Sequence, residues 1–289
     1  MSKASALPRL AWKRVSNAAG MAFYPNTIAG ILASYPKSGR TWFRFILSSY
    51  LARAFDLNLT PDLHSMFTIM PNFDMEPVRG LPAFGFAGHQ PRPPLIAVSH
   101  LPYSRLRFRS HPAIFMVRDP RDVMVSSYFH ATRQKHRFRG DIGGFLRDPE
   151  QGVASLTGYL NGWSAGLQHR RHIILSYEDL SRDPAAETAR VLALLGVEVK
   201  PQSLASAVEA AEFRNMRVLE QATGLPGHDY DRSDDESLRM RRGKVGGFAD
   251  YLTAEQIEFI ERTCDRNLTV NAKTILKPTE FRHVHLAPS

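Results

Sequence analysis

The chain has 289 residues, of which 43% are hydrophobic and 22% are charged, proportions typical of a globular protein with a large buried core. Its 37 Lys and Arg residues outnumber its 28 Asp and Glu residues, which indicates an anionic partner such as a nucleic acid, a membrane surface or a phosphorylated ligand. The single cysteine, Cys264, excludes an internal disulfide and a multi-cysteine metal site, and no apolar run reaches the roughly 18 residues of a membrane span.

Four short apolar runs have the character of fully buried parallel strands: Ile28–Ser34, Leu95–Ser99, Ala113–Val117 and His172–Ser176. Helical patterns follow or intervene at Thr41–Ala54, Pro120–Ala131, Val153–Gln168, Ala185–Leu195, Ser203–Glu212 and Ala254–Asn267. Loops are predicted at Pro71–Pro94, Arg133–Gly144 and Thr223–Asp235. Strands that alternate with helices predict a single α/β domain with a mostly parallel central sheet flanked by helices. We expect a basic arm over residues 1–25, the domain over 26–270 and a tail over 271–289.

Three helix ends carry local signals. Asp119 precedes Pro120 and is expected to cap the helix that begins there, and Thr253 with Gln256 forms a capping-box pattern. Gly196 suits a left-handed stop at the end of another helix. Two of these helix starts lie close to the polar segments that contain Arg118 and Arg241.

Polar residues follow each predicted strand at the point where it ends. The Tyr35–Thr41 segment follows the first strand, and the next three strands are followed by His100, Arg118 and Tyr177. Open parallel sheets bind ligands beyond the carboxyl ends of their strands, so these four endings are expected to line one crevice.

The first of these endings is a turn that contains Lys37, Ser38 and Gly39 before a helix. Backbone amides and the helix dipole make such a turn an anion cradle, in which Lys37 adds a point charge. The order of residues differs from a Walker A loop, in which glycine precedes the lysine. Arg118 and Ser126, at a strand end and on the next helix, can grip a second phosphate from two sides.

At this stage several segments resemble the cytosolic-type sulfotransferase family, in the family's order from about residue 28 to 265. Ser34-Tyr-Pro-Lys-Ser-Gly-Arg-Thr-Trp42 is similar to its 5′-phosphosulfate loop and Val117-Arg-Asp-Pro-Arg-Asp-Val-Met-Val-Ser126 to its 3′-phosphate-binding element. Ser99-His-Leu-Pro102 resembles its catalytic-histidine segment, Ser176-Tyr-Glu-Asp179 a donor-contacting strand, and Arg241-Arg-Gly-Lys-Val-Gly-Gly247 its glycine-rich donor loop.

The resemblance implies a P-loop-NTPase-like strand–loop–helix site for the sulfuryl donor 3′-phosphoadenylyl sulfate (PAPS), with 3′-phosphoadenosine 5′-phosphate (PAP) as product. It implies that the 5′-phosphosulfate is held by Lys37, Ser38, Gly39, Arg40 and Thr41. It implies 3′-phosphate contacts from Arg118, Ser126, Arg241, Arg242 and Gly243, and adenine contacts from Trp42, Tyr177, Phe213 and Met216. His100 is then the general base, assisted by Lys37. The sulfuryl group carries less charge than a phosphoryl group, so we expect no metal requirement.

The sequence departs from the family pattern at several places. Arg40 occupies a position that is usually threonine, and Val98 replaces a lysine that often lies two residues before the histidine, so a stabiliser of the leaving phosphate must come from elsewhere if it exists. The glycine-rich loop continues as Gly246-Gly247-Phe248-Ala249, where the family usually has Gly-Asp-Trp-Lys. The family's dimer segment is also altered, with Ala249, Thr253 and Ala254 at its positions, and leaves the oligomeric state open.

The acceptor is not encoded in a readable motif, and we expect a hydroxyl or amine on a small molecule, a lipid or a glycan. Residues 1–20 form a basic segment that could rest on an anionic membrane surface, although a disordered arm is the preferred interpretation. A cytoplasmic location follows from the single cysteine and the lack of an apolar signal core. Two other classes remain open, a P-loop nucleotide kinase and a basic nucleic-acid-binding protein. No motif that interleaves aromatic and basic residues supports binding of nucleic acid. If His100 is not the base, Asp74 or Glu76 is the next candidate.

Overall fold

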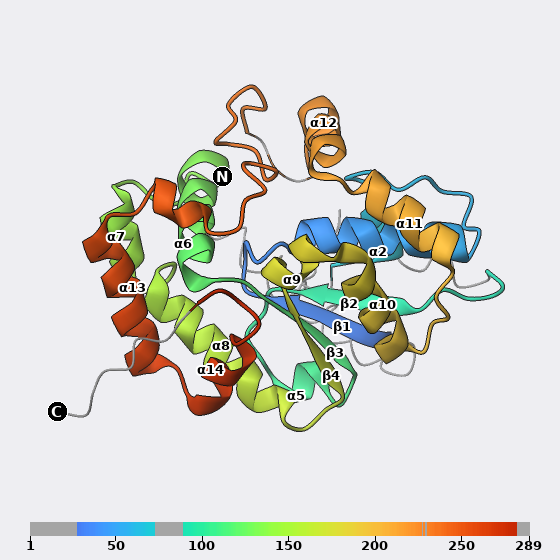
Figure 1. Ribbon diagram of the computed structural model, residues 1–289, viewed down its shortest axis with the longest axis horizontal. Coiled ribbons are helices and arrows are strands. Elements are labelled where there is room, and N and C mark those ends of the chain that lie inside the picture. The colour runs from blue at the N-terminus through green and yellow to red at the C-terminus, as the bar shows by residue number, and fades with distance from the viewer. Residues whose placement is uncertain (1–27, 73–88, 227, 229, 282–289) are drawn as a thin grey trace, which may run out of the picture.

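The computed structural model describes residues 28–72, 89–226, 228 and 230–281 of the chain. Four parallel strands form its central sheet in the order β2–β1–β3–β4 (Figure 1). They are β1 (Ile28–Ser34), β2 (Leu95–Ser99), β3 (Ala113–Val117) and β4 (His172–Ser176). Because the strands run in one direction, their carboxyl ends meet at one edge. The chain reverses its direction of travel across the sheet beside β1, and a ligand crevice is expected there.

Helices cover both faces of this sheet (Figure 1). One layer contains α5 (Arg105–Phe108), α6 (Pro120–Phe129), α7 (Ile142–Arg147), α8 (Val153–Leu167), α13 (Ala254–Asn267) and α14 (Val270–Ile275). The other contains α2 (Arg40–Ala54), α3 (Met66–Ile69), α9 (Tyr177–Arg182), α10 (Pro184–Leu195), α11 (Pro201–Ala210) and α12 (Phe213–Thr223). A π-helical turn, η3 (His130–Gln134), continues α6, and a 3₁₀ turn, η4 (Gly247–Asp250), precedes α13.

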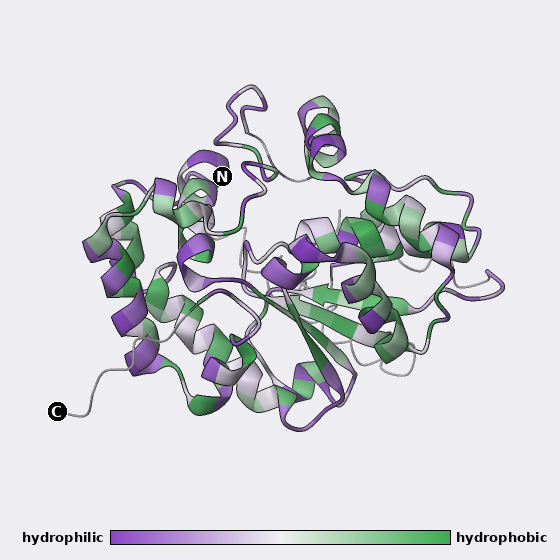
Figure 2. Ribbon diagram, viewed as in Figure 1, coloured by the Kyte–Doolittle hydropathy of each residue, from purple (hydrophilic) through white to green (hydrophobic). Residues whose placement is uncertain are grey.

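The strands alternate between two hydrophobic clusters, one on each face of the sheet. In β3, Phe115 and Val117 pack on the α6–α8 side, whereas Ile114 and Met116 pack on the α2–α10 side. Since a strand buried on both faces exposes no polar row, the strands are nearly continuous apolar segments in Figure 2. This explains why period-2 alternation was absent from the sequence although the elements are strands.

The expected strands match the structure, and each expected helix begins and ends within two residues of the helix in the structure. The helix predicted over Pro120–Ala131 ends as an α-helix at Phe129 and continues as the π-helical turn η3. The three cap predictions are confirmed. Asp119 accepts a hydrogen bond from the Arg121 amide, and Thr253 and Gln256 form the capping box. Gly196 ends α10 with a φ of 69°.

Several short helices were missed because they lie within segments rich in loop-forming or charged residues. The largest is α12, which begins with Phe213 and ends where the Thr223–Asp235 loop was predicted to start. The loop predicted over Arg133–Gly144 contains the end of η3 and the beginning of α7. Of the Pro71–Pro94 loop, residues 73–88 lie outside the described residues.

The packed core includes residues beyond position 270, where the domain was expected to end. Helix α14 packs against α8, and Phe281 is buried in the same hydrophobic cluster. The basic arm, with the membrane contact suggested for residues 1–20, and residues 282–289 lie outside the described residues. Within the described part of the chain, no helix is long and apolar enough to cross a membrane.

Two glycines of α8 differ sharply in their surroundings. A Cβ on Gly166 would collide with the ring of Tyr103, which follows β2 and is held by stacking on Phe108 and by a hydrogen bond of 3.2 Å from Arg170. A Cβ on Gly158 would meet nothing within 4 Å.

We therefore expect Gly158→Ala to stabilise the protein by about 0.5–1 kcal/mol, because alanine is the better helix former. The same change at Gly166 should destabilise it by about 1–3 kcal/mol, because the ring of Tyr103 must move. Chemical denaturation of both variants beside the unmutated chain measures this difference. Equal stabilisation by both changes would contradict the packing described for Tyr103.

Candidate active site

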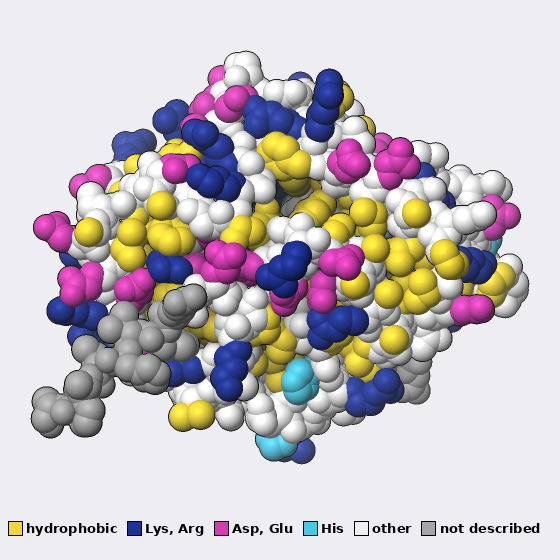
Figure 3. Space-filling view, in the orientation of Figure 1, with side chains coloured by type: hydrophobic (Ala, Val, Ile, Leu, Met, Phe, Trp, Pro, Cys, Tyr) yellow, Lys and Arg dark blue, Asp and Glu magenta, His cyan; other side chains and the backbone are white. Residues whose placement is uncertain are grey.

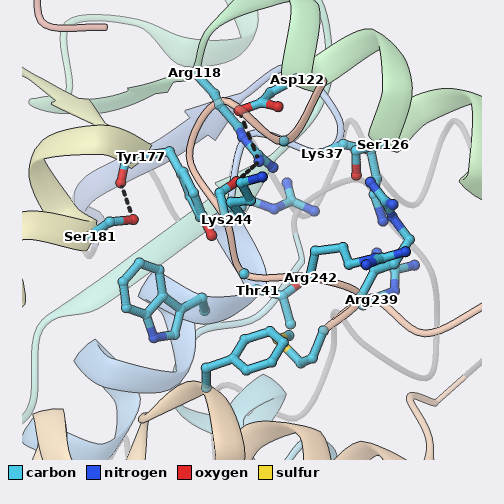
Figure 4. A pocket seen from close by; sticks show the side chains of 18 of the residues that line it. Lys37, Thr41, Arg118, Asp122, Ser126, Tyr177, Ser181, Arg239, Arg242 and Lys244 are labelled. Atoms are coloured by element: carbon cyan, nitrogen blue, oxygen red, sulfur yellow. Dashed lines mark hydrogen bonds and ion pairs between the residues drawn. The ribbon is translucent and has the colours of Figure 1, made fainter. Parts of the chain in front are cut away.

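The carboxyl ends of all four strands line one pocket, with a cavity of about 290 Å³. Lys37 follows β1, His100 follows β2, Arg118 follows β3 and Tyr177 follows β4, as expected from the sequence. Basic side chains stand around a hollow on this face of the molecule (Figure 3). Figure 4 shows Arg118, from the end of β3, and Arg239 and Arg242, from the segment before η4, reaching the same space. The pocket is therefore built for an anion.

The turn after β1 places a lysine at the start of α2. Lys37 and Gly39 both have positive φ, 72° and 91°, so the backbone folds tightly before the helix begins. A Cβ on Gly39 would lie 2.5 Å from the ring of Tyr177, which means that only glycine allows this approach. The first turn of α2 has no acidic residue, and the helix dipole places partial positive charge at its N-terminus, so this terminus suits an anion.

Lys37 lies near other positively charged side chains. Burial lowers the pKa of its ammonium group well below the ordinary value, and the charges of Arg239, Arg241 and Arg118 lower it further, whereas Glu220 raises it. Among the described residues Lys37 makes no ion pair. A bound anion would offset the repulsion between Lys37 and these arginines, and this would increase the affinity of the pocket for the anion.

His100 is held in one tautomer by the backbone of β1. Its Nδ1 lies 2.8 Å from the carbonyl oxygen of Ser34, and since a carbonyl only accepts, Nδ1 carries the proton. The neutral ring therefore has its lone pair on Nε2. Burial lowers the pKa of His100 well below the ordinary value, as does the charge of Arg40, while the bond to Ser34 raises it. A histidine with these properties is neutral near pH 7 and can accept a proton.

Arg118 and Tyr177 form a joined unit at the ends of β3 and β4. The guanidinium of Arg118 lies over the Tyr177 ring, 4.1 Å from its centroid, and pairs with Asp122 at 3.3 Å. Tyr177 also meets Trp42 edge-on, with ring centroids 5.7 Å apart. Ser126, one turn beyond Asp122 on α6, lines the same pocket. The predicted pairing of Arg118 with Ser126 across one pocket is therefore geometrically possible.

Trp42, Phe213 and Gly243 also line the pocket. The indole nitrogen of Trp42 donates to the carbonyl of Ala211 at 2.8 Å, which ties α2 to the chain before α12. Gly243 has a φ of 62°, and a Cβ there would collide with the Phe213 ring. Two aromatic side chains beside a close backbone segment make a slot suited to a flat ring such as a nucleobase.

Arg241 and Arg242 share one carboxylate. Glu236 accepts from Arg241 at 3.0 Å and from Arg242 at 3.0 Å, and Tyr251 donates to it at 3.0 Å. Burial raises the pKa of Glu236, but the bonds from Tyr251 and the two arginines outweigh this and leave it below the ordinary value. Glu236 thus neutralises part of the charge that the two arginines bring to the pocket.

Two residues that the family resemblance assigned to the donor lie away from the pocket wall. Ser38 is buried with its hydroxyl donating to the Tyr35 carbonyl at 3.0 Å, so its side chain stabilises the turn. Met216 is fully buried in the cluster on the α2–α10 side. The other predicted site residues line the pocket: Lys37, Gly39, Arg40, Thr41, Trp42, His100, Arg118, Ser126, Tyr177, Phe213, Arg241, Arg242 and Gly243.

The sequence interpretation missed several residues of the pocket wall. Asp122 lies within the Val117–Ser126 segment but had no predicted role, and its carboxylate accepts from the amides of Gly246 at 3.0 Å and Phe248 at 2.8 Å. Arg239 lies two residues before the matched Arg241–Gly247 segment and also lines the pocket. Ser181, Met240, Lys244 and Gly247 also line the pocket. A carboxylate that binds a distant loop carries no sequence signal.

From the sequence, neither a lysine at position 98 nor a metal ion was expected at the pocket. Val98 is fully buried in an apolar cluster, so β2 contributes no cation two residues before His100. Among residues 28–72, 89–226, 228 and 230–281, no group of three His, Cys, Asp or Glu side chains is arranged to hold a metal ion. Asp74 and Glu76 lie outside the described residues.

A parallel sheet whose first strand leads through a lysine-containing turn into a helix, with arginines at the neighbouring strand end, defines an α/β protein with an anion site of the P-loop kind. The model of the sulfotransferase domain family matches residues 29–272. The chain therefore belongs to the sulfotransferase domain family.

Relatives and solved structures agree with this family. Flavonol 3-sulfotransferase of Flaveria bidentis is 27% identical over 265 residues, which cover 85% of this chain and 82% of the relative. The 3-alpha-hydroxysteroid sulfotransferase of Cavia porcellus is 27% identical over 244 residues, 80% of each chain. The crystal structure of mouse sulfotransferase SULT7A1 complexed with PAP has a TM-score of 0.61 at 19% identity and covers 91% of this chain and 94% of that one. Retinol dehydratase with retinol and PAP has a TM-score of 0.64 at 19% identity, covering 93% and 87%. These two structures share the fold.

The carboxylate of Asp122 should hold the segment that contains Gly246 and Phe248 in place. We expect Asp122→Ala to speed amide hydrogen exchange over residues 243–250 by about ten-fold or more, because two charge-assisted bonds are lost. Asp250→Ala is the matched control, since it removes only the exposed pair with Lys244 at 3.2 Å. Protection that persists in Asp122→Ala would show that other contacts hold this segment.

Proposed function

We propose that this protein transfers a sulfuryl group from PAPS to a hydroxyl or amine acceptor, with His100 as general base. The observation that carries the proposal is the meeting of cations from the β1–α2 turn, the end of β3 and the segment before η4 around one pocket that also contains His100. Membership of the sulfotransferase domain family supports the same reaction.

The donor is assigned to the pocket from its charge and shape. We infer that Lys37 and the first amides of α2 bind the 5′-phosphosulfate. Arg118, Ser126, Arg241, Arg242 and Gly243 are proposed to bind the 3′-phosphate, and Trp42, Tyr177 and Phe213 to enclose the adenine. Ser38 supports the turn, and Met216 supports α12 from the core. The use of PAPS also agrees with the structures of similar fold that hold PAP.

The proposed reaction is a direct in-line transfer. The acceptor oxygen attacks sulfur and forms an O–S bond while the bond from sulfur to the 5′-phosphate oxygen breaks. The acceptor proton passes to Nε2 of His100, and the electron pair of the broken bond leaves with PAP. Lys37 stabilises the negative charge that develops on the departing oxygen.

The other two classes have less support. A nucleotide kinase would be expected to carry a Walker lysine after a glycine, whereas Lys37 precedes Gly39. For a nucleic-acid-binding protein, the arginines would be expected to lie along an open face, but here they converge on a pocket. The acceptor is proposed to be a small molecule, since the relatives are named for flavonols, steroids and amines. Lipid and glycan acceptors remain proposals of the same kind, as does a cytoplasmic location.

The donor assignment predicts that Lys37→Ala and Arg118→Ala each weaken PAP binding by about ten-fold or more, because each leaves a phosphate without a charged partner. Isothermal titration calorimetry with PAP measures the loss. Arg182→Ala is the control, since its side chain is 70% exposed on α9, pairs with Asp179 and is not part of the pocket lining. Unchanged affinity in both pocket variants would remove the donor from this site.

The base assignment predicts that His100→Ala loses roughly a hundred-fold or more of kcat while PAP affinity stays nearly constant, because the imidazole acts on the acceptor. His172→Ala, an exposed histidine at the start of β4, should keep wild-type turnover.

The pH profile gives a second check on the same assignment. Because burial and Arg40 lower the pKa of His100 below its ordinary value of 6.5, the neutral base persists into more acidic solution. The acid limb of kcat/KM should therefore lie below pH 6.5 in the wild type and be absent from His100→Ala. Normal turnover of His100→Ala would place the base elsewhere, with Asp74 or Glu76 as the next candidates.

A further inference from the structure

Arg239 is a pocket residue that the proposed donor contacts do not use. It lines the same cavity as Lys37 and His100, and it comes from the segment between α12 and η4 (Figure 4). A guanidinium remains charged at any physiological pH, even though burial lowers the pKa of Arg239. A buried cation of this kind is costly unless an anion faces it.

The backbone of Arg239 is fixed by a buried carboxylate. Glu220 of α12 is fully buried, and its Oε1 accepts from the Arg239 amide at 2.7 Å and from the Tyr230 hydroxyl at 2.6 Å. Its Oε2 accepts from the Met240 amide at 2.8 Å. The carboxylate thus holds the main chain in place, and both of its oxygens are engaged by groups other than the guanidinium.

The guanidinium itself meets an imidazole ring. Nη2 of Arg239 lies 2.8 Å from Nε2 of His228. Within the described part of the chain its Nε is buried and has no hydrogen-bond partner. Among the residues that the structure describes, Glu220 is the carboxylate whose charge raises the pKa of Arg239. The positive charge of Arg239 is therefore only partly balanced by the protein.

Positive charge also surrounds the proposed base. Besides burial, the charges of Arg40, Arg239 and Arg44 lower the pKa of His100, and no carboxylate among the described residues is a main opposing influence. Arg44 is buried and donates to the Met70 carbonyl and to Asn72 at 2.8 Å, so its charge is fixed in place. The main charges of the described residues that act on His100 are thus cationic.

Arg239 links the donor pocket to a pair of histidines, His228 and His130. His228 and His130 have ring centroids 6.1 Å apart, and neither lines the donor pocket. Burial and the charges of Lys37 and Arg239 lower the pKa of His130, so this pair of histidines lies close to the proposed site of sulfuryl transfer. His130 begins the π-helical turn η3, a feature often found at functional sites.

We propose that the acceptor carries an anionic group, such as a carboxylate, beside its reactive hydroxyl, and that Arg239 binds this group with His228 beside it. The inference rests on the proposed sulfuryl transfer and names the class of its second substrate. A guanidinium binds a carboxylate through two parallel hydrogen bonds, which fixes orientation as well as charge. The carboxylate is unchanged by the reaction, whose bond changes are those given above.

Three phenols of nearly equal size test the proposal. Tyramine, tyrosol and 3-(4-hydroxyphenyl)propanoate share a 4-hydroxyphenyl ring and a two-carbon arm that ends in an ammonium, a hydroxyl or a carboxylate. With PAPS as donor, we expect kcat/KM for the carboxylate to exceed that for tyrosol by about ten-fold or more, and tyramine to be the poorest of the three.

Variants assign the preference to the side chain. Arg239→Met should reduce the carboxylate preference to about three-fold or less, whereas Arg239→Lys should retain part of it, because the charge remains but the paired hydrogen bonds are lost. Arg214→Met is the control, since Arg214 is exposed on α12 and should leave the order of the three phenols unchanged. Thermal unfolding confirms that each variant is folded.

Titration with PAP separates this proposal from the proposed function. PAP affinity within about three-fold of wild type in Arg239→Met assigns the residue to the acceptor, and an equal loss of PAP binding and of turnover on all three phenols would assign it to the donor and overturn the inference. Equal use of the three phenols, a preference for tyramine, or no use of any while PAP binds would also overturn it. Failure of the unmutated protein to bind PAP would instead refute the proposed function.

Discussion

The pocket depends on holding like charges together at the edge of one sheet. Cations that repel one another and are partly removed from water would move apart unless acidic groups restrained the segments that carry them. Asp122, Glu220 and Glu236 provide this restraint, each through bonds to backbone amides or to arginines. The cations they hold come from separate parts of the chain: Lys37, Arg118, Arg239, Arg241 and Arg242.

The restraint works because the acidic groups bind different parts of the segment that follows α12. Glu220 fixes the amides of residues 239 and 240, Glu236 joins two arginine side chains, and Asp122 fixes the amides of residues 246 and 248. Much of the positive charge therefore stays available to an anion in the pocket, because two of the three carboxylates are engaged mainly by neutral amides. The sheet adds rigidity, since the carboxyl ends of β1, β2 and β3 carry Lys37, His100 and Arg118 directly.

Resemblance to the family located most of the pocket wall but did not separate contact residues from supporting ones. Ser38 falls in a matching motif and Met216 was assigned to the adenine by the resemblance, yet the Ser38 side chain stabilises the turn and the Met216 side chain fills the core. A motif records which residue types occur together, and a serine that bonds to its own turn looks the same in sequence as one that faces a ligand. Arg239 shows the converse, because it lies outside the matched Arg241–Gly247 motif and still lines the cavity.

The sequence alone determined the strands, most of the long helices, their caps and the lysine-containing turn, because each depends on neighbouring residues: an apolar run, a capping pair, a glycine at positive φ. It also placed His100 at the end of a strand. The tertiary structure decided the tautomer of His100, which depends on the Ser34 carbonyl of another strand. It decided as well that Asp122 binds the glycine-rich segment and that the Arg239 guanidinium meets His228 instead of a carboxylate. These properties arise from charges and hydrogen bonds between segments that only folding brings together, and local sequence patterns carry no record of them.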